Sequence, residues 1–310
     1  MRLAVIDCGT NTFNLIIIEV DERKKYSKID NTRVPVKLGE GAINKGFIAP
    51  GPFSRGIEAI NSFNELIKKN RVEKVIAFAT SAIRDAANGE EFVQTIYEKF
   101  GIRLTVIDGN REAELIYLGI REAVQLNSDL SLIMDIGGGS TELIIANRDT
   151  IFWKGSFRIG AARLLEKFCP SNPISAAEIK AIHEYLSEQL HSFFEVIKTH
   201  PPFELVGSSG AFDSLVEMIN GELGGEPLTN DKTAYDINME EYFHISSLVQ
   251  SSTLEQRKRI KGLVPMRFDM IVISCLMVDF ILNACALNKL RVSVYSLKEG
   301  ALMDFINRES

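Results

Sequence analysis

The sequence predicts an α/β fold of two domains, each built on a mixed β-sheet flanked by helices. The chain has 310 residues, and chains longer than about 250 residues usually divide into more than one core. A glycine-rich turn between two apolar segments occurs twice, at a constant spacing of 128 residues. In each half, strand-like segments come first and helical periodicity follows, which is typical of α/β proteins. We therefore expect two cores, with the ligand site between the halves.

The first half begins with a strand, a turn and a second strand. Residues 3–6 and 15–20 are apolar, and the turn-forming residues 7–12 separate them. A dinucleotide-binding fold would instead place a helix after its glycines, so that fold is excluded. The later segments of this half are predicted as a helix at 53–70, a strand at 74–79, a helix at 81–100, a strand at 104–107 and a helix from residue 111.

The second half repeats this arrangement. Residues 132–134 and 143–146 are predicted as strands, and residues 135–142 form the turn between them. Further strands are predicted at 151–157, 203–206 and 292–295, and helices at 161–167, 176–198, 239–261, 267–288 and 301–308. No low-complexity linker separates the halves, so we expect the domains to pack tightly and to exchange their end helices.

The two turns align with each other without a gap. The matched pairs are Asp7 with Asp135, Gly9 with Gly137, Thr12 with Ser140, and Leu15 with Leu143. Matching residue types in the same hairpin context indicate an internal duplication whose period is a whole domain.

Composition excludes several classes of protein. Hydrophobic residues make up 45% and charged residues 25% of the chain, as in ordinary globular proteins, so a disordered chain is not expected. The net charge of -6 argues against a nucleic-acid partner, because such proteins need a basic surface. The N-terminus does not resemble a signal peptide, and no apolar run reaches membrane-spanning length. We expect a cytoplasmic protein with no membrane partner.

Both turns carry groups that suit phosphate. Backbone amides in a glycine-rich hairpin converge on an anion because no Cβ blocks the approach, and hydroxyl side chains add donors. Asp7 and Asp135 would repel phosphate unless a cation such as Mg²⁺ lies between them. One glycine triplet alone is common in plain hairpins, whereas two aligned copies favour phosphate binding. The candidates in the turns are Gly9, Thr10, Asn11, Thr12, Gly137, Gly138, Gly139, Ser140 and Thr141.

Two charged residues at helix starts are further candidates. Arg84 follows Thr80 and Ser81 at the start of a predicted helix, where free amides attract anions and an arginine can bind phosphate. A helix cap followed by a solvated arginine explains the same residues equally well. Glu112 lies in the first turn of its predicted helix and can act as a general base toward water. Its alternative role is to complement the helix dipole.

A cationic run stands out in this acidic chain. It consists of Arg257, Lys258, Arg259 and Lys261. Such a run is usually a solvated helix face, but at the border of the cleft it would guide a polyanion.

Several motifs occur in a specific order along the chain. They are D-C-G-T-N-T at 7–12, A-T-S-A-I-R at 79–84, G-N-R-E-A at 109–113, D-I-G-G-G-S-T-E-L at 135–143, G-S-S-G at 207–210, R-F-D at 267–269 and K-E-G-A at 298–301. In order and spacing they resemble the exopolyphosphatase and guanosine pentaphosphate phosphohydrolase family, within the actin, sugar kinase and Hsp70 ATPase superfamily. The resemblance covers essentially the whole chain and is to the short form, without the C-terminal HD-like domain.

This resemblance implies two actin-like (ribonuclease H-like) domains with the active site in the cleft between them. Domain I would comprise residues 1–117 plus 298–310, and domain II residues 118–297. The resemblance implies that Glu112 is the catalytic base, and that Arg84 and the two hairpins hold phosphate. The implied Mg²⁺ ligands are Asp135 and Glu142, to which the repulsion argument adds Asp7. Arg111 departs from the family pattern, which commonly has an acidic residue there, and this puts metal or phosphate binding beside Glu112 in question.

The expected reaction is Mg²⁺-dependent release of the terminal phosphate of inorganic polyphosphate by direct attack of water. The alternative within the family is hydrolysis of the 5′ γ-phosphate of pppGpp to give ppGpp. We also expect a homodimer. Two other classes stay open: an ATP-dependent sugar kinase of the same superfamily, in which residues 207–210 would serve the adenosine, and a non-enzymatic actin-like sensor, for which Glu112 would be dispensable.

Overall fold

Two mixed sheets form the framework of the computed structural model, which describes residues 1–21, 26–229 and 231–308. The first sheet has the strand order β3-β2-β1-β4-β5. Strands β1, β2 and β3 form an antiparallel meander, while β4 and β5 run parallel to β1. Its strands are β1 (Arg2–Cys8), β2 (Thr12–Val20), β3 (Tyr26–Pro35), β4 (Lys74–Ala79) and β5 (Leu104–Val106).

The second sheet repeats this topology and adds one edge strand. Its order is β10-β11-β9-β6-β7-β8, with an antiparallel meander β6-β7-β8 and with β9 and β11 parallel to β6. Its strands are β6 (Ser131–Ile136), β7 (Thr141–Ala146), β8 (Ile151–Phe157), β9 (Glu204–Ser208), β10 (Ala234–Ile237) and β11 (Leu290–Ser293). The shared order of five strands confirms the internal duplication expected from the two turns.

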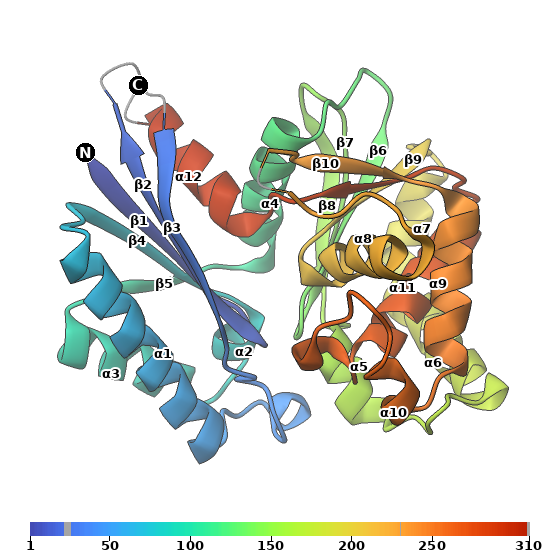
Figure 1. Ribbon diagram of the computed structural model, residues 1–310, viewed down its shortest axis with the longest axis horizontal. Helices are drawn as coiled ribbons and strands as arrows, with labels where there is room; N and C mark the ends of the chain where they lie inside the picture. Colours follow the sequence, from blue (N-terminus) through green and yellow to red (C-terminus); the bar gives the residue numbers. More distant parts are fainter. Residues whose placement is uncertain (22–25, 230, 309–310) are drawn as a thin grey trace.

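Helices cover both faces of each sheet (Figure 1). In the first half they are α1 (Pro50–Lys69), α2 (Ser81–Arg84), α3 (Gly89–Phe100) and α4 (Gly109–Ala123), with the 3-10 turn η1 (Ile43–Lys45). In the second half they are α5 (Ala161–Phe168), α6 (Ala176–Gln189), α7 (His191–Ile197), α8 (Gly210–Leu223), α9 (Met239–Ser251), α10 (Leu254–Arg257), the 3-10 turn η2 (Pro265–Arg267), α11 (Ile271–Ala284) and α12 (Leu297–Arg308). None of the helices in the described ranges is both long and apolar enough to cross a membrane.

The hydrophobic residues form three cores rather than the two expected from chain length. Alternate residues of β1 point to opposite faces, so Ala4 and Ile6 pack with α1 and α3, whereas Leu3 and Val5 pack with α4 and α12. The core around α4 and α12 also contains Ile133 of β6 and other residues of the second sheet. The third core fills the far face of that sheet, against α6, α8, α9 and α11. Helices α4 and α12 therefore join the two halves (Figure 1).

The crossing of α4 and α12 depends on glycine. A Cβ on Gly300 would lie 1.6 Å from the carbonyl oxygen of Leu115, and a Cβ on Gly119 would lie 2.3 Å from that of Ser296. Only residues without a side chain allow the two backbones to approach so closely. The predicted boundary between residues 117 and 118 falls within α4, and the division of the chain into domains I and II stays a prediction.

Some predicted helices are divided in the structure. The one predicted at 81–100 is interrupted between α2 and α3, where Gly89 packs so closely that its Cβ would lie 2.1 Å from the carbonyl oxygen of Ile83. The one predicted at 239–261 stops after α9, because Thr253 forms a capping box that begins α10. The predictions at 176–198 and 267–288 correspond to α6 with α7, and to η2 with α11.

Four elements, β3, α8, β10 and the 3-10 turn η1, have no counterpart among the predicted segments. Strand β3 carries charged residues and alternates between half-buried and exposed positions at the edge of its sheet, so it lacks the apolar run that signals a strand. Helix α8 directly follows the G-S-S-G turn and is mostly buried, which obscures its periodicity.

Candidate active site

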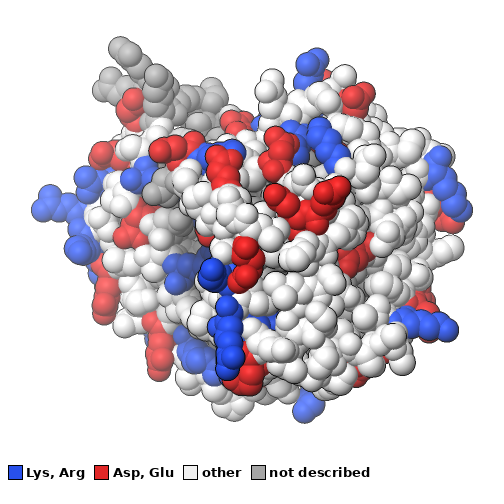
Figure 2. All heavy atoms as spheres, turned by 45° about the vertical axis from the view of Figure 1, so that its right-hand side comes forward, with Lys and Arg blue, Asp and Glu red and all other residues white. Residues whose placement is uncertain are grey.

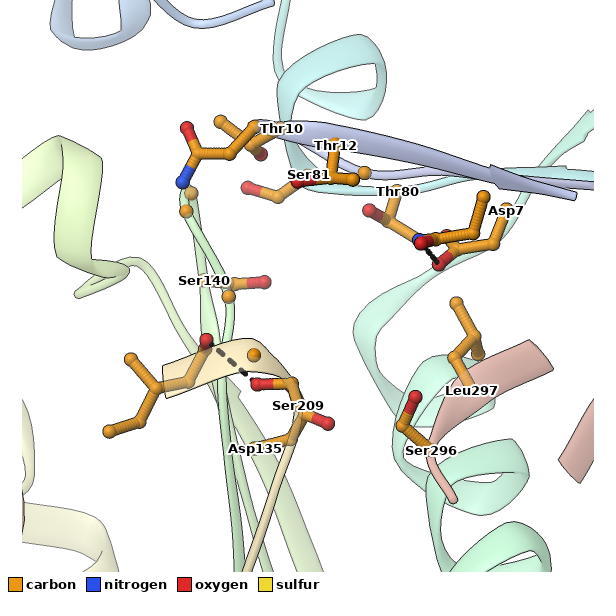
Figure 3. A pocket seen from close by; sticks show the side chains of 18 of the residues that line it. Asp7, Thr10, Thr12, Thr80, Ser81, Asp135, Ser140, Ser209, Ser296 and Leu297 are labelled. Atoms are coloured by element: carbon orange, nitrogen blue, oxygen red, sulfur yellow. Dashed lines mark hydrogen bonds between the residues drawn. The ribbon is translucent and has the colours of Figure 1, made fainter. Parts of the chain in front are cut away.

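A cleft lies between the two glycine-rich hairpins, at the ends of β1 and β6 that lead into the turns. Figure 3 shows Thr10, Thr12 and Ser81 on one side of this cleft, and Ser140 and Ser209 on the other. The predicted residues that line it are Asp7, Gly9, Thr10, Asn11, Thr12, Glu112, Asp135, Gly137, Gly138, Gly139 and Ser140. The structure thus brings together residues that are more than one hundred positions apart in the chain.

The second hairpin presents free amides to the cleft. The Gly137 amide donates to the Ser140 carbonyl at 3.0 Å, which closes the turn. The carbonyls of Gly137, Gly138 and Gly139 accept hydrogen bonds from residues at the start of α5. Among the described residues, the amides of Gly138, Gly139 and Ser140 donate no backbone hydrogen bond. These three consecutive donors are available to an anion.

The first hairpin is built in the same way. The Gly9 amide donates to the Thr12 carbonyl at 3.1 Å, and the carbonyls of Thr10 and Asn11 accept from the backbone of residues 36–39. The hydroxyl of Thr12 is buried and has no partner in the described part of the chain. A buried hydroxyl without a partner is costly, so this donor suits a ligand oxygen.

The tips of the two hairpins touch each other. A Cβ on Gly138 would lie 2.4 Å from the side-chain nitrogen of Asn11, and a Cβ on Gly139 would lie 2.5 Å from the hydroxyl of Ser81 and 2.7 Å from that of Thr10. A side chain at Gly138 would displace the Asn11 amide, and one at Gly139 would also meet the Ser81 Cβ at 3.0 Å. The spacing between the hairpins is therefore set by these contacts.

Glu112 lies in the wall of the cleft with one charged partner. Its helix α4 is capped by Asp108, whose carboxylate accepts from the Arg111 amide. Nη1 of Arg84 donates to the Glu112 carboxylate at 2.9 Å and also to the Ile107 carbonyl at 3.0 Å. Burial raises the pKa of Glu112 to about 7, an effect that Arg84 reduces and that Asp7 and Asp135 increase. A carboxyl with a pKa near neutrality is well matched to accept a proton.

Three other buried carboxyls surround Glu112. Burial raises the pKa of Asp7 to about 6, although Asn14 donates to it at 3.0 Å. Asp135 accepts from the Ser208 hydroxyl, and burial raises its pKa as well. Glu142 lies opposite Asp135 in the β6–β7 ladder, and burial together with the charge of Glu112 raises its pKa. The four carboxyls destabilise one another in the ionised form, so a cation would be favoured among them.

No group of three or more His, Cys, Asp or Glu side chains is arranged to hold a metal ion by itself, among the described residues. Mg²⁺ commonly takes one or two carboxylates and completes its shell with phosphate oxygens and water. Asp135 and Glu142 are hard oxygen donors on adjacent strands, so they fit such a partial site.

Three predicted site residues lie outside the cleft lining. Arg84 is in the layer behind Glu112, where it orients the carboxylate. Glu142 is 1% exposed and accepts from the Ser156 hydroxyl at 2.7 Å. The Thr141 hydroxyl points to the Ile159 carbonyl at 3.4 Å, inside the second half.

Four charged or amide side chains that line the cleft were not among the predicted site residues. They are Asn14, Arg33, Arg267 and Lys298. The last three are the cations of the cleft, and each comes from a different element: β3, the end of η2 and α12. Asn14 occupies the position equivalent to Glu142, at the same spacing of 128 residues that relates Asp7 to Asp135. That spacing was a usable signal for Asn14, whereas nothing local marks Arg33.

Comparison with known proteins decides the family. The model of the Ppx/GppA phosphatase family matches residues 16–309. The chain belongs to this family. It is 35% identical to an exopolyphosphatase from Cytophaga hutchinsonii whose crystal structure superimposes with a TM-score of 0.96, covering 99% of this chain and 98% of that one. The Aquifex aeolicus member of the Ppx/GppA family is 26% identical with a TM-score of 0.82, covering 100% of this chain and 99% of that one.

A further relative is Exopolyphosphatase 1 of Mycobacterium tuberculosis. It is 24% identical over 313 residues, which cover 100% of this chain and 90% of the relative. Membership of the Ppx/GppA phosphatase family confirms the predicted α/β fold of actin-like type, and it makes the protein an enzyme that hydrolyses phosphoanhydride bonds.

Arg111, which was expected to affect metal or phosphate binding beside Glu112, lies outside the cleft lining. Its guanidinium forms ion pairs with Glu114 of α4 and with Asp304 of α12. Glu114 is paired in turn with Lys154 of β8. Arg111 therefore connects α4 to α12 and has no direct contact with the carboxyls around Glu112 in the described structure.

The cationic run at Arg257 also lies outside the cleft lining. The Arg257 side chain is buried and donates to the carbonyls of Ser252 and Phe268. Lys258 pairs with Glu255 at the surface. On the face drawn in Figure 2, Lys and Arg side chains are scattered among Asp and Glu side chains. Among the described residues, the positive charges that line the cleft are those of Arg33, Arg267 and Lys298.

Proposed function

We propose that this Ppx/GppA phosphatase is a Mg²⁺-dependent exopolyphosphatase, which releases the terminal phosphate of inorganic polyphosphate by direct attack of water. Two of the relatives described above carry the name exopolyphosphatase, and this supports the choice of substrate. The observation that carries the proposal is the position of Glu112, a buried carboxylate held by Arg84 in the wall of a cleft between the two glycine-rich hairpins.

The proposed role of Glu112 is that of general base. Arg84 fixes one carboxylate oxygen, and the carboxylate accepts a proton from a water molecule that lies between it and the terminal phosphorus. The water oxygen forms a bond to this phosphorus while the bond to the bridging oxygen breaks. The shortened polyphosphate leaves with the bridging oxygen, and no covalent intermediate with the protein forms. The reaction therefore depends on positioning and on charge stabilisation more than on nucleophilic side chains.

The hairpins and the cleft cations stabilise the charge of the phosphate groups. The free amides of Gly138, Gly139 and Ser140 and the Thr12 hydroxyl are fixed donors, which need no reorganisation when charge develops. Arg267 and Lys298 add positive charge on the same cleft. Burial and the neighbouring Arg33 lower the pKa of Arg267 to about 10, so it stays protonated near neutral pH.

Asp135 and Glu142 would hold Mg²⁺, and Asp7 faces them from the first hairpin. When bound, this ion would neutralise phosphate oxygens and reduce the repulsion among the buried carboxyls. Asn14 in place of a carboxylate opposite Asp7 leaves the first hairpin with less negative charge than the second. We therefore propose that the metal is held mainly by the second hairpin.

A substrate panel tests the proposal. Phosphate release is measured side by side from polyphosphates of graded length, from pppGpp and from ATP, with and without Mg²⁺, for the wild type and Glu112→Gln. The glutamine has nearly the same shape but cannot accept the proton, so we expect polyphosphate turnover to fall at least about 100-fold while the melting temperature is retained. Unchanged turnover in this variant would rule out Glu112 as the base.

The same panel separates the alternatives. Faster release from pppGpp than from polyphosphate at equal concentration would assign the alternative substrate. Consumption of ATP only in the presence of a sugar would indicate a kinase, and nucleotide-dependent light scattering without turnover would indicate a filament-forming sensor. We also propose a homodimer, which size-exclusion chromatography with light scattering tests directly.

A further inference from the structure

Arg163 connects the two halves of the molecule at the edge of the phosphate cradle. It lies in the first turn of α5 and is 5% exposed. Its Nε donates to the Gly139 carbonyl at 2.9 Å, its Nη1 to the Ile43 carbonyl at 3.1 Å and its Nη2 to Asp85 at 2.9 Å. One guanidinium therefore bonds the second hairpin, the turn η1 and the end of α2 at the same time.

The groups that Arg163 holds belong to the walls of the cleft. Gly139 is part of the second hairpin, while Asp85 directly follows Arg84, the partner of Glu112. The Ser81 hydroxyl, which lines the cleft, donates to the same Asp85 oxygen at 3.4 Å. A shift of Asp85 relative to Gly139 would consequently move Arg84 and Glu112 relative to the amides of the second hairpin.

The surrounding contacts show that this edge is a built connection between the halves. The side-chain amide of Asn44 in η1 donates to the Arg163 carbonyl at 3.0 Å, and the backbone amide of Asn44 donates to the carboxylate of Glu166 in α5 at 3.2 Å. Helices α4 and α12 join the halves at another place, and η1 lies beside α5 at the opposite end of the molecule (Figure 1). The cleft lies between these two connections, so both determine its width.

Arg158 provides a natural comparison, because it binds the same carboxylate from the solvent side. Its Nε lies 3.0 Å from the Asp85 oxygen that Arg163 also contacts, but its side chain is 62% exposed. Within the described structure, Arg158 makes no hydrogen bond to Gly139 or Ile43. The two arginines thus share a partner and a charge, and they differ in burial and in the link to the hairpin. Exposed ion pairs contribute little to stability, whereas the planar guanidinium of a buried arginine holds several hydrogen-bond partners in one geometry.

We propose that Arg163 is a positioning residue for phosphoanhydride hydrolysis: by tying the Gly139 carbonyl to Asp85, it fixes the position of Arg84 and Glu112 relative to the second phosphate hairpin without contacting the substrate. This inference rests on the proposed function, in which a phosphate chain lies between the hairpins and Glu112 activates water.

The test compares Arg163→Ala with Arg158→Ala. Steady-state kinetics with polyphosphate should show kcat at least about 10-fold lower in Arg163→Ala, because small displacements of reacting groups are costly, and within about two-fold of wild type in Arg158→Ala. Arg163→Lys keeps the positive charge but loses the planar guanidinium that reaches three partners, so its kcat should also stay below that of wild type. Guanidinium ion at millimolar concentration should restore part of kcat in Arg163→Ala only. Equal kcat in the two alanine variants, or full activity in Arg163→Lys, would overturn the proposal.

A second measurement needs no substrate and separates this inference from the proposed function. Hydrogen exchange of the amides in η1 and α2 should be faster in Arg163→Ala than in wild type and Arg158→Ala. Absence of polyphosphate hydrolysis by wild type would defeat the proposed function, whereas unchanged exchange in Arg163→Ala would defeat the positioning role. If Arg163→Ala does not fold, Asp85→Asn has nearly the wild-type shape and removes the ion pair; wild-type kcat in that variant would also contradict the proposal.

Discussion

Replacing Gly139 by alanine is the most direct test of how the two hairpins fit together. The added methyl would lie 2.5 Å from the Ser81 hydroxyl, 2.7 Å from the Thr10 hydroxyl and 3.0 Å from the Ser81 Cβ. The two hydroxyls can rotate away from the methyl, but the Ser81 Cβ cannot. Ordinary contact begins at 3.4 Å, so α2 must retreat from the second hairpin by about 0.4 Å.

The displacement should lower the rate of catalysis while the protein stays folded. Misplacement of reacting groups by about 1 Å costs on the order of 100-fold in rate, so a smaller shift should cost about 10-fold, and overpacking at one contact costs about 1–3 kcal/mol of stability. We therefore expect Gly139→Ala to lower kcat/KM for polyphosphate about 10-fold and to remain folded. Phosphate release gives the kinetic constants, and urea unfolding gives the free energy of unfolding.

Gly51→Ala is the matched control for this experiment. Gly51 lies in α1, where the nearest atom to an added Cβ is a nitrogen of Arg55 at 3.7 Å. This variant should have wild-type kinetics, because the added Cβ is far from both hairpins and meets only the end of the Arg55 side chain. If Gly139→Ala retained more than half of the wild-type kcat/KM, contact between the hairpin tips would not set the active geometry.

Further predictions concern the base, the helix crossing and the metal. Because Glu112 accepts a proton only when ionised, and its raised pKa is about 7, kcat/KM should increase from about pH 6 to about pH 8; a profile that is flat over this range would contradict its role. Gly300→Ala places a methyl 1.6 Å from the Leu115 carbonyl oxygen, so it should lower the free energy of unfolding, measured by urea titration, by about 3 kcal/mol or more. A loss below about 1 kcal/mol would show that the α4–α12 crossing adapts to a side chain. Chelation with EDTA should abolish phosphate release, and added Mg²⁺ should restore it. Asp135→Asn should require a higher Mg²⁺ concentration than wild type for the same activity. Turnover that persists in EDTA would exclude the proposed metal dependence.

The hairpins could be predicted from the sequence because their signal is local. Three consecutive glycines, flanking apolar strands and a second copy at a fixed spacing all lie within short segments. Glu112 could also be predicted, since the neighbouring residues indicate that it lies in the first turn of a helix that follows a strand. These features determine the backbone of the cleft, and the structure places them around it.

The cations of the cleft could not be predicted in the same way. Arg33 comes from an edge strand with little apolar character, and Arg267 lies at the end of a short 3-10 turn far along the chain. Arg267 and Lys298 each begin a motif in the sequence, but their position in the cleft depends on how distant elements pack. The role of Arg163 was hidden for the same reason, because its partners lie 24, 78 and 120 residues away. Arg84 was identified as a candidate, but its contact with Glu112 depends on the tertiary fold.

The core around α4 and α12 has a consequence for synthesis on the ribosome. Leu3 and Val5 in β1 are covered by Leu297 and Leu302 of α12, nearly the whole described chain later. Strand β1 leaves the exit tunnel long before α12, so this face of β1 stays open to water until α12 has been made. During this interval the apolar side of β1 and β2 is open to chaperones and to other nascent chains. The duplicated fold cannot be completed one half at a time, because α12, which covers one face of the first sheet, follows the second half in the sequence.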